Sequence, residues 1–204
     1  MKKEKKIFDT SIQHENISGK IVVGLERISE AFRVLLWEHG KNSGLSPIQI
    51  QILIFLKYHS EQLCGVSYLS KEFNMTKPTI SDAVKSLQQK GLVSKSKDSS
   101  DSRSFLISLT QDGNKMVQSL EYFALPIKDK IDSLDQNEQN HLLNSIIKII
   151  FKLNQSGILT VQRTCFACKY YEQNKNESYC NLMKSTIADS DIRIDCPEFE
   201  KRLP

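Results

Sequence analysis

The stretch MTKPTISDAVKSLQQKGLVSKSKDSSDSRSFLISLTQDG, residues 75–113, decides which fold this chain adopts. Its first half predicts a helix that has Thr76 as N-cap, carries Pro78 in its first turn and ends at Gly91. Four apolar residues recur at the i, i+3, i+4 and i+7 spacing of one helical face, namely Ile80, Ala83, Val84 and Leu87. The remaining positions are polar, so we expect the helix to bury one side and to present a polar surface on the other.

The second half of the stretch predicts a β-hairpin. Apolar and polar residues alternate in LVSKSK (residues 92–97) and in SFLISLT (residues 104–110), as they do in half-buried strands. The polar segment DSSDSR (residues 98–103) joins the two runs. The pattern therefore indicates an antiparallel pair of strands with a charged tip.

Three helices are expected before residue 75. The first carries apolar residues at a 4-3-4-3 spacing, close to that of a coiled-coil seam, at Ile21, Leu25, Ile28, Phe32 and Leu35. The second helix begins with Ser46 as N-cap and Pro47 at the first helical position. Its dense Ile and Leu content predicts a buried central helix. A short third helix is indicated around residues 66–73.

Two further helical regions are expected after residue 110. Pro126 should kink or split the first of them, because proline has no N–H to donate. Asp135 and Glu138 form a capping-box pattern at the start of the last helix, which carries two apolar stripes. This order of elements predicts a mainly α fold with a small β-wing, a winged helix-turn-helix with long helices at its N- and C-terminal sides.

The polar helix face and the hairpin predict contact with double-stranded DNA. In a winged helix-turn-helix one helix enters the major groove, and the wing lies beside it on a phosphate or minor-groove site. The segment from Lys77 to Arg103 holds six basic and three acidic residues, an excess that suits phosphate contacts. The expected contact residues are Thr76, Lys77, Pro78, Thr79, Ser81, Asp82 and Lys85 in the helix, and Lys95, Lys97, Ser100, Asp101 and Arg103 in the wing. For any single residue the alternative is a solvated surface, or protection of a strand edge by lysine.

These segments resemble the MarR-type transcriptional regulators over about residues 15–155. The resemblance lies in LSPIQIQIL (residues 45–53), in residues 75–113 and in LDQNEQNHLLNSIIKII (residues 134–150). It implies a homodimer that binds pseudo-palindromic DNA, usually as a repressor, with interlocking first and last helices. It also implies that Arg103 is the wing-tip arginine in the minor groove, oriented by Asp101 or Asp98.

A homodimer is also expected from the apolar stripes themselves. Three short helices and a hairpin cannot bury two long flanking helices, whereas a second copy of the chain can cover them. The expected organisation is a basic N-terminal tail (1–14), an N-terminal dimerisation helix (15–45), the winged helix-turn-helix (46–110), C-terminal dimerisation helices (111–157) and a cysteine-rich extension (158–204).

Composition narrows the class of protein. The 204 residues are 39% apolar and 25% charged, with a net charge of +4, as in an ordinary globular protein. No apolar run reaches the ~18 residues of a membrane span, and no apolar core follows the basic start MKKEKKIFDT, so a cytoplasmic location without membrane contact is expected. No Gly-rich phosphate loop or nucleophile with a base partner is evident, and the four histidines lie far apart in sequence, which argues against an enzyme.

Four of the five cysteines lie in the last 41 residues with the spacing C-x2-C-x11-C-x15-C, at Cys165, Cys168, Cys180 and Cys196. A C-x2-C turn lets two thiolates meet one metal ion, and two more complete a tetrahedral set. Nearby aromatic residues are too few to fold this segment unaided, so metal binding would supply the missing stability. We favour structural zinc; an iron–sulfur cluster is the main alternative, and redox disulfides or no ligand stay open. Cys64 stands alone and is expected to be a buried core thiol.

The sequence thus predicts a dimeric, metal-containing transcriptional regulator. Two other interpretations stay open: a metal or redox sensor whose cysteine cluster switches DNA binding, and a winged-helix adaptor that binds proteins instead of DNA. The electropositive segment from Lys77 to Arg103 argues against the adaptor. The partners that follow from the leading interpretation are double-stranded DNA, a second copy of the chain and a small-molecule effector.

Overall fold

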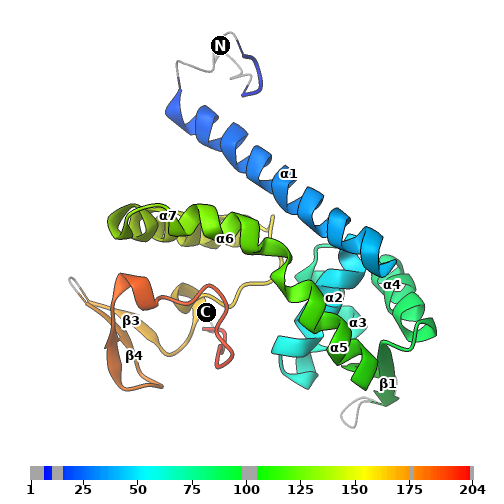
Figure 1. The fold of residues 1–204 in the computed structure, drawn as a ribbon. Helices are drawn as coiled ribbons and strands as arrows, with labels where there is room; N and C mark the ends of the chain where they lie inside the picture. The colour runs from blue at the N-terminus through cyan, green and yellow to red at the C-terminus, as the bar shows by residue number, and fades with distance from the viewer. Residues whose placement is uncertain (1–6, 11–15, 98–104, 175–176, 203–204) are drawn as a thin grey trace, which may run out of the picture.

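The computed structural model describes residues 7–10, 16–97, 105–174 and 177–202 and is mainly helical, with two small antiparallel sheets (Figure 1). This is the predicted fold class. In chain order its elements are α1 (Ile17–Ser43), α2 (Pro47–Tyr58), η2 (Glu61–Leu63), α3 (Val66–Glu72), α4 (Lys77–Gln89), β1 (Val93–Lys97), β2 (Phe105–Leu109), α5 (Gln111–Leu120), η3 (Glu121–Ala124), α6 (Leu125–Asp132), α7 (Gln136–Gln155), η4 (Cys165–Ala167), β3 (Tyr171–Gln173), β4 (Ser178–Cys180), β5 (Ser185–Ile187) and η5 (Asp189–Asp191).

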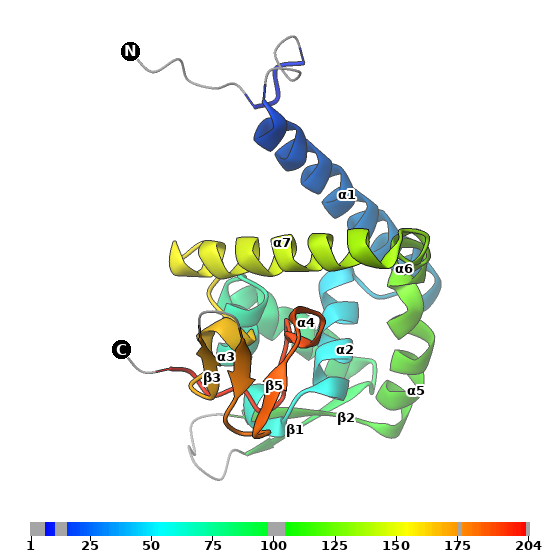
Figure 2. The same cartoon turned by 90° about the vertical axis from the view of Figure 1, so that its left-hand side faces the viewer.

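Helix α1 is long, and its N-terminal part extends away from the other elements (Figures 1 and 2). Asn16 caps it by accepting a hydrogen bond from the Ser18 N–H, and Gly44 ends it in the left-handed conformation at φ 64°. Gly40 lies where α1 approaches the segment that leads into α2. A Cβ at this position would lie 2.4 Å from the Leu45 carbonyl oxygen, so the close approach requires glycine. The close packing of α1 on the core is thus confined to its C-terminal end.

Helix α2 is the centre of the winged-helix core. Ser46 is its N-cap and Pro47 its first residue, as predicted, and the Gln49 side chain accepts a hydrogen bond from the Ser46 N–H at 3.0 Å. Ile50, Ile52 and Leu53 have no exposed surface. The helix packs against α1, α4, α5 and β2, so its dense apolar sequence is explained by neighbours on several sides.

The region after the hairpin divides where Pro126 predicts a break. Helix α5 ends at Leu120, a 3-10 turn follows, and Pro126 lies in the first turn of α6, where its missing N–H costs nothing. Asp135 then caps α7: its Oδ1 accepts hydrogen bonds from the N–H groups of Asn137 and Glu138, both at 2.9 Å. The predicted capping box is present.

The last segment folds against α7 and around a sheet in the order β3-β4-β5 that the sequence analysis did not predict. Its core consists of Tyr171, Ile187 and Ile192 with two cysteines, and it includes the fully buried Ile147 of α7. Phe151 of α7 meets Phe166 edge-on at 6.0 Å between ring centroids. One apolar stripe of α7 is therefore covered by the chain's own tail, a contact that the expectation of a dimerisation helix did not include. Among the described residues no helix is both long and apolar enough to cross a bilayer.

Candidate nucleic-acid interface and cysteine site

Helix α4 is the predicted recognition helix, and Thr76 fixes its start. The Thr76 hydroxyl oxygen accepts a hydrogen bond from the Thr79 N–H at 3.3 Å, and the two threonine hydroxyls lie 2.8 Å apart. Pro78 occupies the first turn. The cap holds both hydroxyl groups at the leading end of the helix, where their remaining lone pairs can accept a further hydrogen bond.

One face of α4 is buried and the other is open. Ile80, Ala83, Val84 and Leu87 belong to the core, as predicted. The residues expected to contact DNA lie outside it: Thr76, Lys77, Pro78, Thr79, Asp82 and Lys85 are exposed, and Ser81 is half-buried. The open face therefore combines hydroxyl groups with two lysines, a composition suited to a phosphate backbone and base edges.

The wing is the hairpin of β1 and β2. Its register pairs Val93 with Leu109 and Lys97 with Phe105. Lys95 and Lys97 are exposed, whereas Ile107 is buried and its N–H donates to the Cys64 carbonyl at 3.0 Å, which fixes the hairpin to the loop after α2. Of the expected wing residues, Ser100, Asp101 and Arg103 lie outside the described residues, as does Asp98.

A threonine joins the end of α4 to the helix after the wing. The Thr110 hydroxyl donates to the Gly91 carbonyl at 2.7 Å and accepts from the Gly113 N–H at 3.0 Å, which caps α5. The Thr110 N–H donates to the Leu92 carbonyl at 3.1 Å. These bonds close the base of the wing beside the recognition helix and explain why the segment from Gly91 to Gly113 has so specific a pattern.

The four tail cysteines line one small cavity of about 40 Å³. Cys165 and Cys168 are buried, Cys180 and Cys196 are half-buried, and no disulfide joins any of the five cysteines. A tight turn brings the first two together, since the Cys168 N–H donates to the Cys165 carbonyl at 2.9 Å. The sheet contributes Cys180, which pairs with Tyr171.

The segment before Cys196 surrounds the sulfur atoms with donors. The Arg193 N–H donates to the Cys165 Sγ at 3.3 Å, and the Arg193 Nη1 lies 3.9 Å from the Cys196 Sγ. Burial raises the pKa of Cys165, the nearby thiols raise it further, and the Arg193 N–H opposes them. A bound cation would reverse that balance, because a thiol that coordinates a metal ion is deprotonated and releases its proton to solvent.

The four tail cysteines line one cavity, but a shared cavity is not by itself a metal-coordination site. In the described part of the chain no group of three or more His, Cys, Asp or Glu side chains is placed so that it could hold a metal ion. Four thiolates fit a tetrahedral metal ion in number and in softness. A metal centre at these cysteines therefore stays a prediction.

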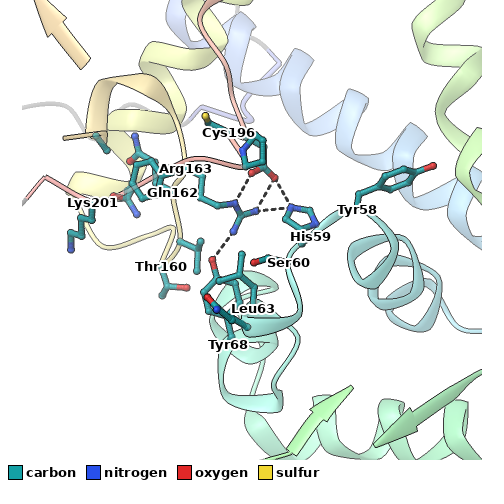
Figure 3. A pocket seen from close by; sticks show the side chains of 17 residues that line it. Tyr58, His59, Ser60, Leu63, Tyr68, Thr160, Gln162, Arg163, Cys196 and Lys201 are labelled. Carbon is teal, nitrogen blue, oxygen red and sulfur yellow. Dashed lines mark hydrogen bonds and ion pairs between the residues drawn. The ribbon is translucent and has the colours of Figure 1, made fainter. Parts of the chain in front are cut away.

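The sequence analysis missed a polar network around Arg163, a residue only 9% exposed. Its guanidinium donates to both oxygens of Asp195 at 2.5 and 2.8 Å, and to both oxygens of Glu72 at 2.7 and 3.1 Å. It also donates to the Tyr68 hydroxyl at 2.7 Å, and the His59 Nε2 lies 2.9 Å from the Asp195 Oδ2 (Figure 3).

Electrostatics favours the charged forms in this network. The bonds to Asp195 and Glu72 raise the pKa of Arg163 against the opposing effect of burial. Burial likewise opposes ionisation of Asp195, but hydrogen bonds from Arg163 and His59 outweigh it and lower the pKa of that carboxyl. His59 and Asp195 are 136 residues apart, so no local pattern could have linked them.

The winged-helix portion matches known proteins. Residues 43–104 match the model of the MarR family. The uncharacterized HTH-type transcriptional regulator YdcH of Bacillus subtilis is 35% identical over 92 residues, which are 43% of this chain and 58% of YdcH. The aligned part thus spans less than two thirds of that relative.

Solved structures show the same fold. The S. aureus MepR–DNA complex superposes with a TM-score of 0.58 at 21% identity, covering 65% of this chain and 97% of MepR. A MarR transcriptional regulator from Methanosarcina mazei Go1 gives a TM-score of 0.55 at 22% identity, covering 68% of this chain and 96% of its own. Over residues 43–104 this chain is therefore similar to the MarR family, and its fold is that of the winged-helix structures named above.

Proposed function

We propose that this protein is a homodimeric transcriptional regulator that binds a pseudo-palindromic DNA operator, as a repressor. One observation carries the proposal: α4 presents an open face with Lys77 and Lys85, while its opposite face is buried in the winged-helix core. The crystallised complex of MepR with DNA supports the same use of this fold. In the proposal α4 lies in the major groove, Lys95 and Lys97 approach phosphates, and Arg103 reaches the minor groove.

The test is binding to a duplex that the wild-type protein itself selects from a random-sequence library. Fluorescence anisotropy should show affinity falling linearly on logarithmic axes with salt. Lys85→Ala should weaken binding and reduce that slope by about one, because one phosphate contact is lost. Lys130→Ala, which removes an equally exposed lysine from α6, is the matched control.

Arg103→Ala should weaken binding chiefly to sites with a narrow, A·T-rich minor groove beside the major-groove site. Failure to enrich any duplex, or binding with no dependence on salt, would contradict the proposal. Such a result would favour the alternative function, a winged-helix adaptor that binds other proteins.

The dimer is proposed from apolar residues that the single chain leaves open. Helix α1 exposes a stripe that includes Ile21, Leu25 and Ile28, and Trp37 is 56% exposed near its end. Leu142 and Ile149 of α7 are also exposed, on positions that the tail does not cover. A second copy of the chain would bury both sets and would place two α4 helices on successive half-sites.

At the cysteine site we propose a structural zinc ion held by Cys165, Cys168, Cys180 and Cys196, with an iron–sulfur cluster as the alternative. The shared cavity and the Arg193 donors support it. Metal analysis and absorption spectra of the purified protein distinguish the two, since zinc is colourless and the cluster absorbs visible light. Cys168→Ser should lose the metal and Cys64→Ala should keep it. A metal-free wild-type protein with four reactive tail thiols would contradict both versions.

An effector site is proposed at a cavity of about 740 Å³ between the end of α2, the segment after α7 and the cysteine segment (Figure 3). Its size lies within the range of small-molecule sites, and Tyr58, Tyr68 and Phe199 line it beside polar groups. A thermal-shift screen of small aromatic compounds, compared between wild type and Tyr68→Ala, tests this site.

A further inference from the structure

The segment that leads into the cysteine site is bonded to the turn of the helix-turn-helix. Asn74 lies in that turn with φ 49°, and its side-chain amide donates to the Ile158 carbonyl at 3.1 Å. The Thr160 hydroxyl lies 2.8 Å from the Asn74 Oδ1 and also donates to the Lys71 carbonyl at the end of α3. The turn that sets the angle between α3 and α4 therefore has partners outside the winged helix.

Arg163 makes a second attachment to α3, at Tyr68 and Glu72. Its guanidinium binds Tyr68 of that helix (Figure 3) and also Glu72, and on the other side it binds Asp195 of the cysteine segment. Both carboxylates are held through two nitrogen–oxygen contacts, a geometry that fixes orientation as well as distance. Lysine has a single ammonium group and cannot reproduce it.

The backbone places this attachment directly beside two of the cysteines. The Cys196 N–H donates to the Arg163 carbonyl at 3.1 Å, and Arg163 and Asp195 form a parallel bridge. The Cys165 N–H donates to the Arg193 carbonyl at 3.3 Å. Asp195 adjoins Cys196 in sequence, so a displacement of that cysteine displaces the carboxylate that holds Arg163.

We propose that Arg163 is a positioning residue that transmits the folded state of the cysteine segment to α3, to the turn at Asn74 and so to α4. This proposal rests on the DNA-binding function proposed above and adds its regulation. With the attachment intact the outer face of α4 is open, so the folded cysteine segment corresponds to the state that binds DNA. If the cysteine segment loosens, α3 and the turn at Asn74 become less ordered. DNA binding must then restore that order, at a cost in binding free energy.

The first experiment reads the coupling without DNA. Amide hydrogen exchange over residues 66–76 is compared in wild type, Cys196→Ser, Arg163→Gln and the double variant. Cys196→Ser should speed exchange in α3 and the turn, while amides of α5 stay protected and show that the winged helix is folded. In the Arg163→Gln background Cys196→Ser should add little, because its path to α3 is already broken.

Arg202→Gln is the matched control. This arginine binds the Tyr171 carbonyl within the cysteine segment, so Cys196→Ser should keep its full effect on α3 in that background. Arg163→Lys keeps the charge and should restore only part of the protection, as expected for an orienting role. Unchanged exchange in α3 on Cys196→Ser, or equal increments in the Arg163→Gln and Arg202→Gln backgrounds, would overturn the proposal.

The second experiment measures the affinity of the same variants for the selected duplex. Arg163→Gln and Cys196→Ser should each weaken binding roughly tenfold, within the usual range of coupling between two sites, and the double variant should be no weaker than either. If exchange shows the coupling but Arg163→Gln binds DNA as wild type does, transmission to α4 is disproved. If wild type binds no duplex, the proposed function fails instead, and the exchange data still decide the coupling to α3.

Discussion

At the scale of single residues, Cys64 lies in a different core from the tail cysteines. It is 2% exposed in the winged-helix core, and its thiol donates to the Ser60 carbonyl at 3.4 Å. Burial, with a smaller contribution from Glu61, raises the pKa of Cys64 from 9.0 to about 11. Cys64 is a core side chain, as the sequence predicted, and its raised pKa leaves little of the reactive thiolate near neutral pH.

Cys64 should therefore be labelled by iodoacetamide far more slowly in the native protein than in denaturant at pH 8. The pKa of Cys64 is higher in the folded protein, so the unfolded chain loses this proton at a lower pH. The contribution of Cys64 to stability should therefore be constant below about pH 9 and should fall as pH rises from about 9 to about 11. Mass-spectrometric mapping checks the labelling. Unfolding titrations of wild type and Cys64→Ala check the slope, which the variant should lack. Fast native labelling at pH 8 would contradict the assigned burial.

Single residues also show where local signals were sufficient. Thr76 and Asp135 were predicted as helix caps because a cap bonds to N–H groups two or three residues away. Arg163 was missed because Glu72 and Asp195 lie 91 and 32 residues from it. Side-chain networks of that span depend on which segments the fold brings together.

At the scale of elements, the contact between α5 and the start of the wing depends on a missing side chain. A Cβ on Gly113 would lie 2.0 Å from the Leu92 carbonyl oxygen and 3.3 Å from the Leu109 Cδ2. The Thr110 bond to Leu92 holds the two backbones at this distance. Glycine is required here for close approach, although a glycine within a helix is otherwise unfavourable.

Gly113→Ala should destabilise the protein by about 1–3 kcal/mol, because the added methyl group forces backbone apart. Gly24→Ala is the control: nothing lies within 4 Å of a Cβ at that position of α1, so helix propensity should make the change neutral or stabilising by up to about 1 kcal/mol. Urea unfolding followed by circular dichroism measures both. Equal effects of the two changes would show that Gly113 is not a contact position.

The length of each element decides whether the periodicity of its apolar residues can predict it. Helices of 12 to 27 residues, such as α2 and α1, have enough turns for a stripe to appear in the sequence. The tail strands have three residues each, too few for alternation to be recognised, so their sheet was not predicted.

At the scale of the whole molecule, the apolar stripe of α1 leaves several large apolar side chains exposed, among them Ile21, Leu25 and Ile28. Leu25 is 40% exposed although it lies in the centre of that stripe. The core that the tail forms with α7 contains Ile147, and none of its described residues belongs to α1. A second subunit is the partner that the proposed function requires.

Leu25→Lys should therefore weaken the dimer by roughly two orders of magnitude or more, because a symmetric interface loses two buried leucines at about 1.5–3 kcal/mol each. Light scattering across a concentration series measures it. Glu26→Lys introduces the same side chain next to the stripe and should leave the dimer intact. A wild-type protein that stays monomeric at micromolar concentration would contradict the proposed assembly.

The sequence by itself determined the winged helix: its caps, apolar stripes, proline break and hairpin all act over a few residues, and each is present in the structure. It also identified the four tail cysteines as one group, because their clustering and C-x2-C spacing can be read directly from the sequence. Only the tertiary structure decided that the tail packs on α7 and that Arg163 joins it to α3. Those contacts join segments that are far apart in the sequence. No local pattern of residues therefore predicts which side chains pair with a buried charge such as Arg163.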